Sequence, residues 1–315
     1  MSVTTVETID THTLGEPTRI VLRGFPFLRG RTMKERSRDL LRRHGDARRA
    51  LMWEPRGHAV MFGAIVVPPA TPGADLGLVF MDGGGAVDMC VHGTMGAVTA
   101  LVETGRLKPG RDGVLVVDTP ASAVRVRVRR SGRRVESVEL EGVPSRSVAR
   151  DLPARVGDRE VAYHLAYGGN LIAIVPGSAL GVKVESRSYK QLVVAGMELK
   201  RQAQAKRADV VSALVYARLG NGKYRDLVVF RDNSVDRSPC GSCVSAFMAH
   251  MHAGGRLKTG QWIECENLLG LGFRARLRER AGELIPDLLG SAFITGEHRF
   301  RIDSRDPLRH GFQLS

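Results

Sequence analysis

The feature that most constrains how this chain folds is an internal repeat: a block that begins at Cys90 recurs at Cys240, 150 positions later. The blocks read CVHGTMGAVTALVETGRLKPG and CGSCVSAFMAHMHAGGRLKTG, and they align without a gap. Each contains a cysteine, a turn of small residues, an apolar helix and a Gly-Arg-Leu-Lys end. Self-similarity at a fixed spacing indicates a duplicated structural unit. Two unrelated helices with similar ends are the alternative, and they would leave the identical spacing unexplained.

The strand pattern predicts an α+β or barrel-like architecture. With 315 residues, of which 43% are hydrophobic, the chain has room for one long domain or two compact ones. Helices are expected at 32–49, at 188–206 and in the two repeated blocks. Short β-forming runs bounded by turn signals lie at 3–9, 18–22, 64–67, 78–81, 114–117, 124–128, 162–165, 171–175, 210–215 and 227–230. Many short strands with few long helices argue against a doubly wound sheet.

The net charge of +14, with an isoelectric point near 10.3, raises nucleic acid as a partner. Only eight of the 47 basic residues are lysine, however, and the arginines are spread through the whole chain. We therefore interpret the basic run at 32–49 as the solvated face of a helix and expect no nucleic-acid partner. A basic nucleic-acid-binding protein stays the alternative of another class. A DNA-binding assay at low and moderate salt would separate the two.

The cysteines and the N-terminal residues predict a cytoplasmic protein. Four cysteines in a chain of this length do not form a secreted disulfide framework. The first twenty residues lack the charged and apolar regions of a signal peptide, and no apolar run approaches the roughly 18 residues that cross a bilayer. We expect no membrane association, and in a reducing cytoplasm the thiols stay available for chemistry.

The position of Cys90 and Cys240 at helix starts predicts acid–base chemistry. Unpaired N–H groups and the positive end of the helix dipole favour the thiolate form of a cysteine there. Two such cysteines on opposite sides of a cleft could remove a proton from one face of a carbon and supply one to the other, which inverts a stereocentre without a cofactor. The glycine-rich turns at 83–85 and 240–242 are expected to offer backbone N–H groups to a carboxylate.

The motif C-x-x-C, formed by Cys240 and Cys243, allows two other interpretations. This spacing is typical of redox pairs and of half a zinc site. A redox protein would leave Cys90 unexplained, and zinc would need further ligands. His92 alone fits a ligand, a base or a structural residue equally well. Cys265 has no motif around it and is expected to be a buried apolar residue.

Several motifs, read together, resemble the proline racemase family, which includes 4-hydroxyproline 2-epimerases and trans-3-hydroxyproline dehydratases. The strings are DTHTLGEPTR at 10–19, EPRGH at 54–58, MCVHGT at 89–94, GGN at 168–170, DRSPCG at 236–241, ENLLG at 266–270 and DPLRHGF at 306–312. The resemblance implies two pseudo-symmetric halves, each a β-barrel-like sheet around a central helix, as in diaminopimelate epimerase. Residues 1–155 with 290–315 would form the half that carries Cys90, and 156–289 the half that carries Cys240.

The resemblance also implies the site. Cys90 and Cys240 would be the two acid–base thiols in a cleft between the halves, and their both being cysteine favours inversion over dehydration. The substrate-binding positions that match the family are Val91, His92, Asp236, Gly241 and Ser242. Of these, His92 and Asp236 would lie beside the substrate amine, and the amides of 91–92 and 241–242 would hold its carboxylate.

Three further residues bear on the substrate. By position, Phe62 and Phe230 resemble the aromatic pair that encloses proline, and Val210 falls where hydroxyproline epimerases tend to carry a histidine. Plain core packing is the alternative for all three. Two departures from the family pattern are Val91, in place of glycine, and Cys243-Val244, in place of Gly-Thr.

Together, these features predict a cofactor-independent isomerase: an amino-acid racemase that acts on proline, with a 4-hydroxyproline 2-epimerase as the alternative. The expected partner is a small amino acid, and no metal or organic cofactor is expected. A homodimer is one assembly that the sequence allows.

Overall fold

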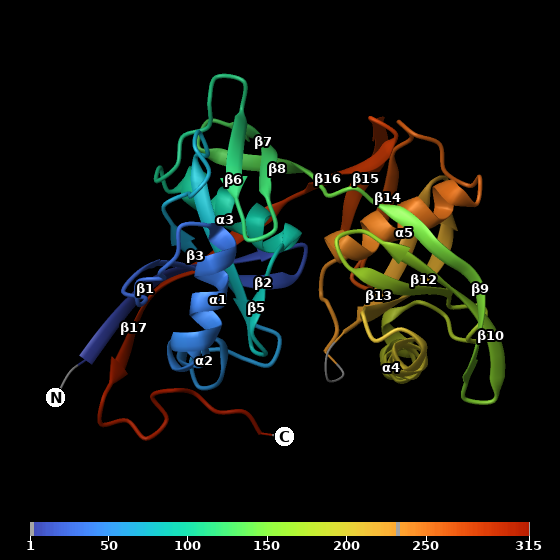
Figure 1. Cartoon of the computed structure of the whole chain (residues 1–315), viewed down its shortest axis with the longest axis horizontal. Coiled ribbons are helices and arrows are strands. Elements are labelled where there is room, and N and C mark those ends of the chain that lie inside the picture. The colour runs from blue at the N-terminus through green and yellow to red at the C-terminus, as the bar shows by residue number, and fades with distance from the viewer. Residues whose placement is uncertain (1–2, 231–233, 315) are drawn as a thin grey trace. The chain divides into compact units, whose positions relative to one another are not determined.

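The computed structural model describes residues 3–230 and 234–314. The chain divides into two compact units (Figure 1). One consists of Met1–Leu140 with Ser291–Ser315, and the other of Glu141–Gly290. The C-terminal segment thus returns to the first unit, where its strand pairs with the first strand of the chain.

The first unit is a mixed sheet with three helices. Its strands are β1 (Val3–Thr13), β2 (Glu16–Arg23), β3 (Phe62–Val67), β4 (Leu76–Asp82), the short β5 (Ala86–Val87), β6 (Val114–Asp118), β7 (Ala123–Ser131), β8 (Arg134–Glu141) and β17 (Ala292–Asp303). The helices are α1 (Met33–Arg43), α2 (Gly45–Met52) and α3 (Val91–Glu103).

The second unit is a similar mixed sheet with fewer helices. Its strands are β9 (Arg146–Val156), β10 (Arg159–Tyr167), β11 (Leu171–Pro176), β12 (Val210–Gly220), β13 (Lys223–Val229), β14 (Ile263–Glu266), β15 (Gly272–Arg280) and β16 (Glu283–Gly290). The helices are α4 (Tyr189–Lys206) and α5 (Gly241–Ala253), with one turn of 3-10 helix before α4.

The order and direction of the strands show that the two units are copies of one topology. In the first unit the neighbours run β17, β1, β2, β3, β4, β6, β7, β8, and their pairings are antiparallel, antiparallel, parallel, antiparallel, parallel, antiparallel and antiparallel. In the second unit β9 to β16 follow one another in chain order with the same series of directions. The duplication that the repeated cysteine blocks predict is therefore confirmed.

Each unit has a central helix that is buried against its sheet, and the repeated blocks form these two helices, α3 and α5. Nearly every residue of α3 and α5 is buried, on all sides of the helix. Such helices need apolar or small residues throughout, and this is what the two blocks supply. In the second unit, alternate residues of β12 face different helices: Val215 packs in the cluster that includes Leu192 of α4, whereas Tyr216 contacts Phe247 of α5. The sheet thus separates α5 from α4.

Two details differ from the sequence-based expectation. The helix expected at 32–49 is two helices, because the backbone leaves helical geometry at His44, which caps the end of α1 and precedes α2. The boundary expected at residue 155 falls inside β9, whose pairing with β10 makes it part of the second unit, so that this unit begins earlier, at Glu141. No helix in the described part of the chain combines the length and hydropathy that crossing a bilayer requires.

Candidate active site

Cys90 stands at the start of α3, and its sulfur acts as the cap of that helix. The Gly93 amide donates to Cys90 Sγ at 3.3 Å, and the residue is 6% exposed. The backbone carbonyl of Cys90 accepts from both the amide and the hydroxyl of Thr94. A sulfur held at a helix N-terminus in this way is close to several N–H dipoles, which stabilise negative charge on it.

His92 lies against Cys90 and is fixed on three sides. Its two ring nitrogens are 3.5 and 3.4 Å from Cys90 Sγ. The ring of Phe62 meets it edge to face, with centroids 4.6 Å apart. The hydroxyl of Thr13 donates to the His92 carbonyl at 2.8 Å. The first unit therefore brings together three of the residues that the sequence singles out, Cys90, His92 and Phe62, while Val91 forms the half-buried first residue of the same helix.

The glycine turn at 83–85 does not have the role expected from the sequence. The amides of Gly84 and Gly85 both donate to Asp82 Oδ1, at 2.8 and 2.6 Å. The carbonyl of Gly83 accepts from Trp53 Nε1 and from Arg48. An aspartate directly before the glycines thus takes up the two N–H groups, and the expectation that they bind a carboxylate of the substrate is wrong.

Cys240 occupies in the second unit the position that Cys90 occupies in the first, at the residue before the central helix. Its sulfur is 3.3 Å from the hydroxyl of Ser242, and Gly241 is the buried first residue of α5. Of the four cysteines, all within the described ranges, Cys240 is the one that is not buried, and none takes part in a disulfide. The chain thus carries a cysteine at the N-cap position of the central helix in each copy of the fold, and of these two sulfurs Cys90 Sγ accepts a capping hydrogen bond whereas Cys240 Sγ does not.

A glycine allows a strand and the central helix to pack closely in each unit, and this packing positions the two thiols. In the first unit the glycine belongs to the helix, and in the second it belongs to the strand side. In the first unit Gly96 of α3 approaches β1 so closely that an added Cβ would lie 2.5 Å from Thr11 Oγ1. In the second, Gly168 follows β10, and a Cβ there would lie 2.3 Å from the Ser242 carbonyl and 2.4 Å from the Ala246 nitrogen. Gly168, from the GGN string, therefore allows the first turn of α5 to rest on β10.

Asp236 belongs to the segment that leads to Cys240. Its Oδ1 accepts from the amide and the hydroxyl of Ser238, at 3.2 and 3.1 Å, which closes a turn two residues before the cysteine. It also lies near Asp226 of β13, which is buried. Burial raises the pKa of Asp226 well above its usual range, and the charges of Asp236 and Glu266 raise it further. Sequence reasoning missed this buried carboxyl, because an Asp inside a hydrophobic strand pattern carries no motif.

Phe230 and Val210 have different surroundings. Phe230 directly follows β13, and its amide donates to the Ser234 carbonyl. Val210 is 1% exposed and belongs to the hydrophobic cluster that includes Leu192 and Leu199 of α4. Its burial there favours packing, and its expected contact with substrate stays a prediction.

Three of the recognised strings, at 10–19, 54–58 and 306–312, contribute contacts that hold the first unit together. Buried Arg19 forms a two-pronged ion pair with Asp10 and donates to the Leu51 carbonyl. Arg56 donates to the carbonyls of Leu308 and Arg309 at 2.9 and 2.7 Å, which fixes the C-terminal DPLRHGF segment. These contacts give the charged residues of the strings a structural role.

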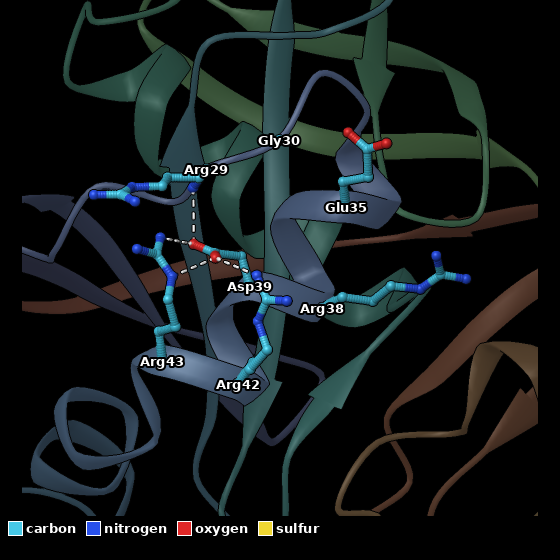
Figure 2. Close-up of a pocket in the computed structure, with 7 residues that line it drawn as sticks. All are labelled: Arg29, Gly30, Glu35, Arg38, Asp39, Arg42 and Arg43. Carbon is cyan, nitrogen blue, oxygen red and sulfur yellow. Dashed lines mark hydrogen bonds and ion pairs between the residues drawn. The ribbon is translucent and has the colours of Figure 1, made fainter.

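The basic helix α1 borders a hollow of about 530 Å³, which Figure 2 shows. Asp39 accepts from Arg43 Nε and from the Arg29 amide, and the pairing with Arg43 holds the pKa of this carboxyl far below its ordinary value. In Figure 2 Arg38 points away from Asp39. Arg42 and Arg43 both pair with Asp39, and the exposure of Arg38, Arg42 and Arg43 agrees with the solvated helix face expected from the sequence. Within the ranges described, no group of three or more His, Cys, Asp and Glu side chains could hold a metal ion.

Sequence comparison relates the whole chain to enzymes of one kind. The family described as Proline racemase matches residues 8–313. A proline racemase from Clostridioides difficile is 37% identical over 98% of this chain and 98% of its own length. A 4-hydroxyproline 2-epimerase from Ancylobacter novellus is 36% identical over 96% of this chain and 97% of its own length.

Structural comparison gives the same relationship. A hydroxyproline epimerase from Agrobacterium vitis, solved with bound trans-4-hydroxy-L-proline, superposes with a TM-score of 0.89 at 27% identity, over 98% of this chain and 95% of that one. A PhzF-family protein from Bacillus anthracis has a TM-score of 0.63 at 14% identity, over 95% of this chain and 99% of that one, a likeness of fold alone. The expected α+β fold of two similar halves is confirmed.

Proposed function

The chain belongs to the proline racemase family, and on that premise we propose that it is a proline racemase that inverts the α-carbon with Cys90 and Cys240. That it is an isomerase, a racemase or epimerase, follows from its relatives along the whole chain. One observation carries the two-thiol assignment: a cysteine at the N-cap position of the central helix occurs once in each copy of the duplicated fold.

In the proposed reaction the two sulfurs act on opposite faces of one α-carbon. With Cys240 as thiolate and Cys90 as thiol, Cys240 Sγ takes the α-proton, and Cys90 Sγ gives its proton to the other face. The reverse direction starts from the opposite protonation states. Each turnover therefore leaves the thiol and thiolate exchanged, and the enzyme must exchange protons with water or with the next substrate before it repeats the same direction.

The negative charge that develops at the α-carbon has to be stabilised by fixed dipoles. The first amides of α3 and α5, at Val91-His92 and Gly241-Ser242, are the groups we assign to the substrate carboxylate. His92 contacts Cys90 Sγ through its ring, so it can donate to that sulfur when it is a thiolate. We assign Asp236 to the substrate amine, because the neighbouring carboxyl, that of Asp226, has a raised pKa and so tends to be neutral.

Proline is the substrate we favour over 4-hydroxyproline. Phe62 is 8% exposed and lies beside His92, so a ring carbon packed on it would have an apolar neighbour. We assign Phe230, with Phe62, to the pocket for the substrate ring. Val210 is also assigned there, and its side chain offers no hydrogen bond to a 4-hydroxyl group. A buried hydroxyl without a partner costs about 1–3 kcal/mol, which corresponds to roughly ten- to hundredfold in rate.

The test is a comparison of kcat/KM for L-proline and trans-4-hydroxy-L-proline, with the product enantiomer measured by chiral chromatography. A ratio that favours proline by about tenfold or more supports the proposal. A ratio that favours hydroxyproline identifies a 4-hydroxyproline 2-epimerase instead. Turnover of neither imino acid would contradict the assigned substrate class.

The cellular setting follows from the same chemistry. The three thiols of Cys90, Cys240 and Cys243, which have to stay reduced for this chemistry, suit a reducing compartment such as the cytoplasm. The only partner this reaction requires is the amino acid itself.

A further inference from the structure

Cys243 is the third residue of α5, and it differs from the corresponding residue of the first unit. At the start of α3, Gly93 occupies this third position after the capping Cys90. At the start of α5, Cys243 occupies it after the capping Cys240. The duplicated fold thus presents one helix start with a single thiol and one with two. The two-thiol mechanism uses only the capping cysteines and leaves Cys243 without a role.

The first unit shows how close a side chain at this third position lies to the capping sulfur. A Cβ added to Gly93 would be 2.9 Å from Cys90 Sγ. In a disulfide of standard bond lengths, the Cβ of one cysteine lies about 3 Å from the sulfur of the other. The distance between capping residue and third residue is therefore that of a disulfide, once the capping sulfur turns toward the helix as Cys90 does.

The surroundings of Cys243 favour the same pairing. Its side chain is completely buried, its sulfur is 3.6 Å from the Ser212 hydroxyl, and the Cys240 thiol is close enough to influence its pKa. Burial raises the pKa of the Cys243 thiol, and its interaction with Cys240 raises it further. Cys243 thus stays protonated, while the more exposed Cys240 is the sulfur that a soluble oxidant reaches first.

We propose that Cys240 and Cys243 form a reversible disulfide when a hydroperoxide oxidises the enzyme, and that Cys243 thereby protects the catalytic thiol from irreversible oxidation. Cys240 thiolate attacks the O–O bond of hydrogen peroxide, becomes a sulfenic acid and releases hydroxide. Cys243 then gives its proton to the hydroxyl of the sulfenic acid as its sulfur attacks Cys240 Sγ, so that the S–O bond breaks, an S–S bond forms and water leaves. Two electrons pass from the two sulfurs to the peroxide. A dithiol reductant reverses the change.

The consequence for activity rests on the proposed function, but the disulfide itself does not. Cleavage after Arg237 and Arg256 gives the peptide 238–256, which contains Cys240 and Cys243 and no other cysteine. Cys90 and Cys265 fall in other tryptic peptides. Mass spectrometry without reductant therefore detects the bond even in a protein that turns over no imino acid.

The experiment treats the purified full chain with hydrogen peroxide and measures the peptide masses before and after dithiothreitol. In the wild type, peptide 238–256 should lose the mass of two hydrogens and regain it with dithiothreitol, and racemase activity should fall and return with it. In Cys243→Ala, Cys240 should instead gain two oxygens, the mass of a sulfinic acid, which dithiothreitol does not remove; fragmentation of the peptide assigns the oxygens to Cys240 rather than to Met248 or Met251. Cys265→Ala is the matched control and should behave as the wild type.

Two results would overturn the proposal. One is a wild-type peptide 238–256 that gains oxygen and never loses two hydrogens. The other is a disulfide that joins Cys240 to Cys90 or Cys265 rather than to Cys243. Reversible loss of two hydrogens in a protein without racemase activity would leave the disulfide established and refute only the proposed function.

Discussion

Gly168→Ala should slow catalysis although the residue has no chemical group of its own. The substitution places a methyl group 2.3 Å from the Ser242 carbonyl oxygen and 2.4 Å from the Ala246 nitrogen. Both are backbone atoms of α5, so no side-chain rotation relieves the overlap. Ordinary contact begins at 3.4 Å. The first turn of α5, with Cys240 at its start, therefore has to move away from β10 by about 1 Å.

This displacement sets the size of the effect. A misplacement of about 1 Å at reacting groups can reduce the rate about a hundredfold. Overpacking of this kind typically costs about 1–3 kcal/mol of unfolding free energy, which a domain of this size can lose and remain folded. We expect kcat/KM for L-proline to fall about a hundredfold, while Tm falls by a few degrees.

The assay measures kcat/KM by chiral chromatography and Tm by circular dichroism, with Gly45→Ala as the matched control. At Gly45, in the first turn of α2, the nearest atom to an added Cβ is Arg49 Nη1 at 3.4 Å, the end of a flexible side chain. This control should keep full activity. Wild-type kcat/KM in folded Gly168→Ala would refute the argument that close approach of α5 to β10 positions Cys240.

Three further predictions follow from the site and the core. Cys90→Ser and Cys240→Ser should each lower kcat about 10²- to 10⁴-fold with Tm unchanged, because a hydroxyl is far less acidic than a thiol; near-wild-type turnover in either would contradict the two-thiol assignment. Burial, with the charges of His164 and Arg256, lowers the pKa of His250 to about 3, below its unfolded value of 6.5. Protonation therefore favours the unfolded state, and the free energy of unfolding should fall by up to about 1.4 kcal/mol per pH unit as the pH drops from 6.5 towards 3. Urea unfolding at several pH values measures this. The same dependence of the unfolding free energy on pH in His250→Gln would exclude His250 as the cause. Activity should survive exhaustive chelation but not alkylation by iodoacetamide. Pyrrole-2-carboxylate, which mimics a flattened α-carbon, should protect against the alkylation. Activity that is lost on chelation and restored by zinc would support the C-x-x-C metal alternative.

The sequence predicts the helix starts well because their signal is local. A cysteine, small residues and an apolar run are contiguous at both Cys90 and Cys240, and a repeated contiguous pattern needs no knowledge of long-range contacts. The break between α1 and α2 at His44 has a weaker local signal: Gly45, a poor helix former, follows it, but the runs on both sides form helices and His44 makes no side-chain cap bond to α2. Strand β15 was missed although its apolar residues Phe273, Ala275 and Leu277 alternate with arginines, which is a detectable period of two.

Long-range contacts account for what the sequence could not supply. The role of Gly168 depends on the backbone of α5, which lies more than seventy positions further along the chain. In the 83–85 turn, the amides of Gly84 and Gly85 bind the Asp82 carboxylate, and the sequence does not determine the direction in which this side chain points. Val210 was placed near the substrate by position, and only three-dimensional packing shows its neighbours in the α4 cluster.

The most direct test of the two-thiol account is the position of deuterium after a brief reaction of L-proline in D2O. If two different groups act on the two faces, the D-proline formed early carries solvent deuterium at its α-carbon, while the L-proline that remains keeps its original hydrogen. NMR of the α-position, after separation of the enantiomers, measures both. The account predicts this asymmetry from either enantiomer. Early deuterium in the unreacted L-proline, or product that retains the substrate's own hydrogen, would point to one group acting on both faces and would contradict it.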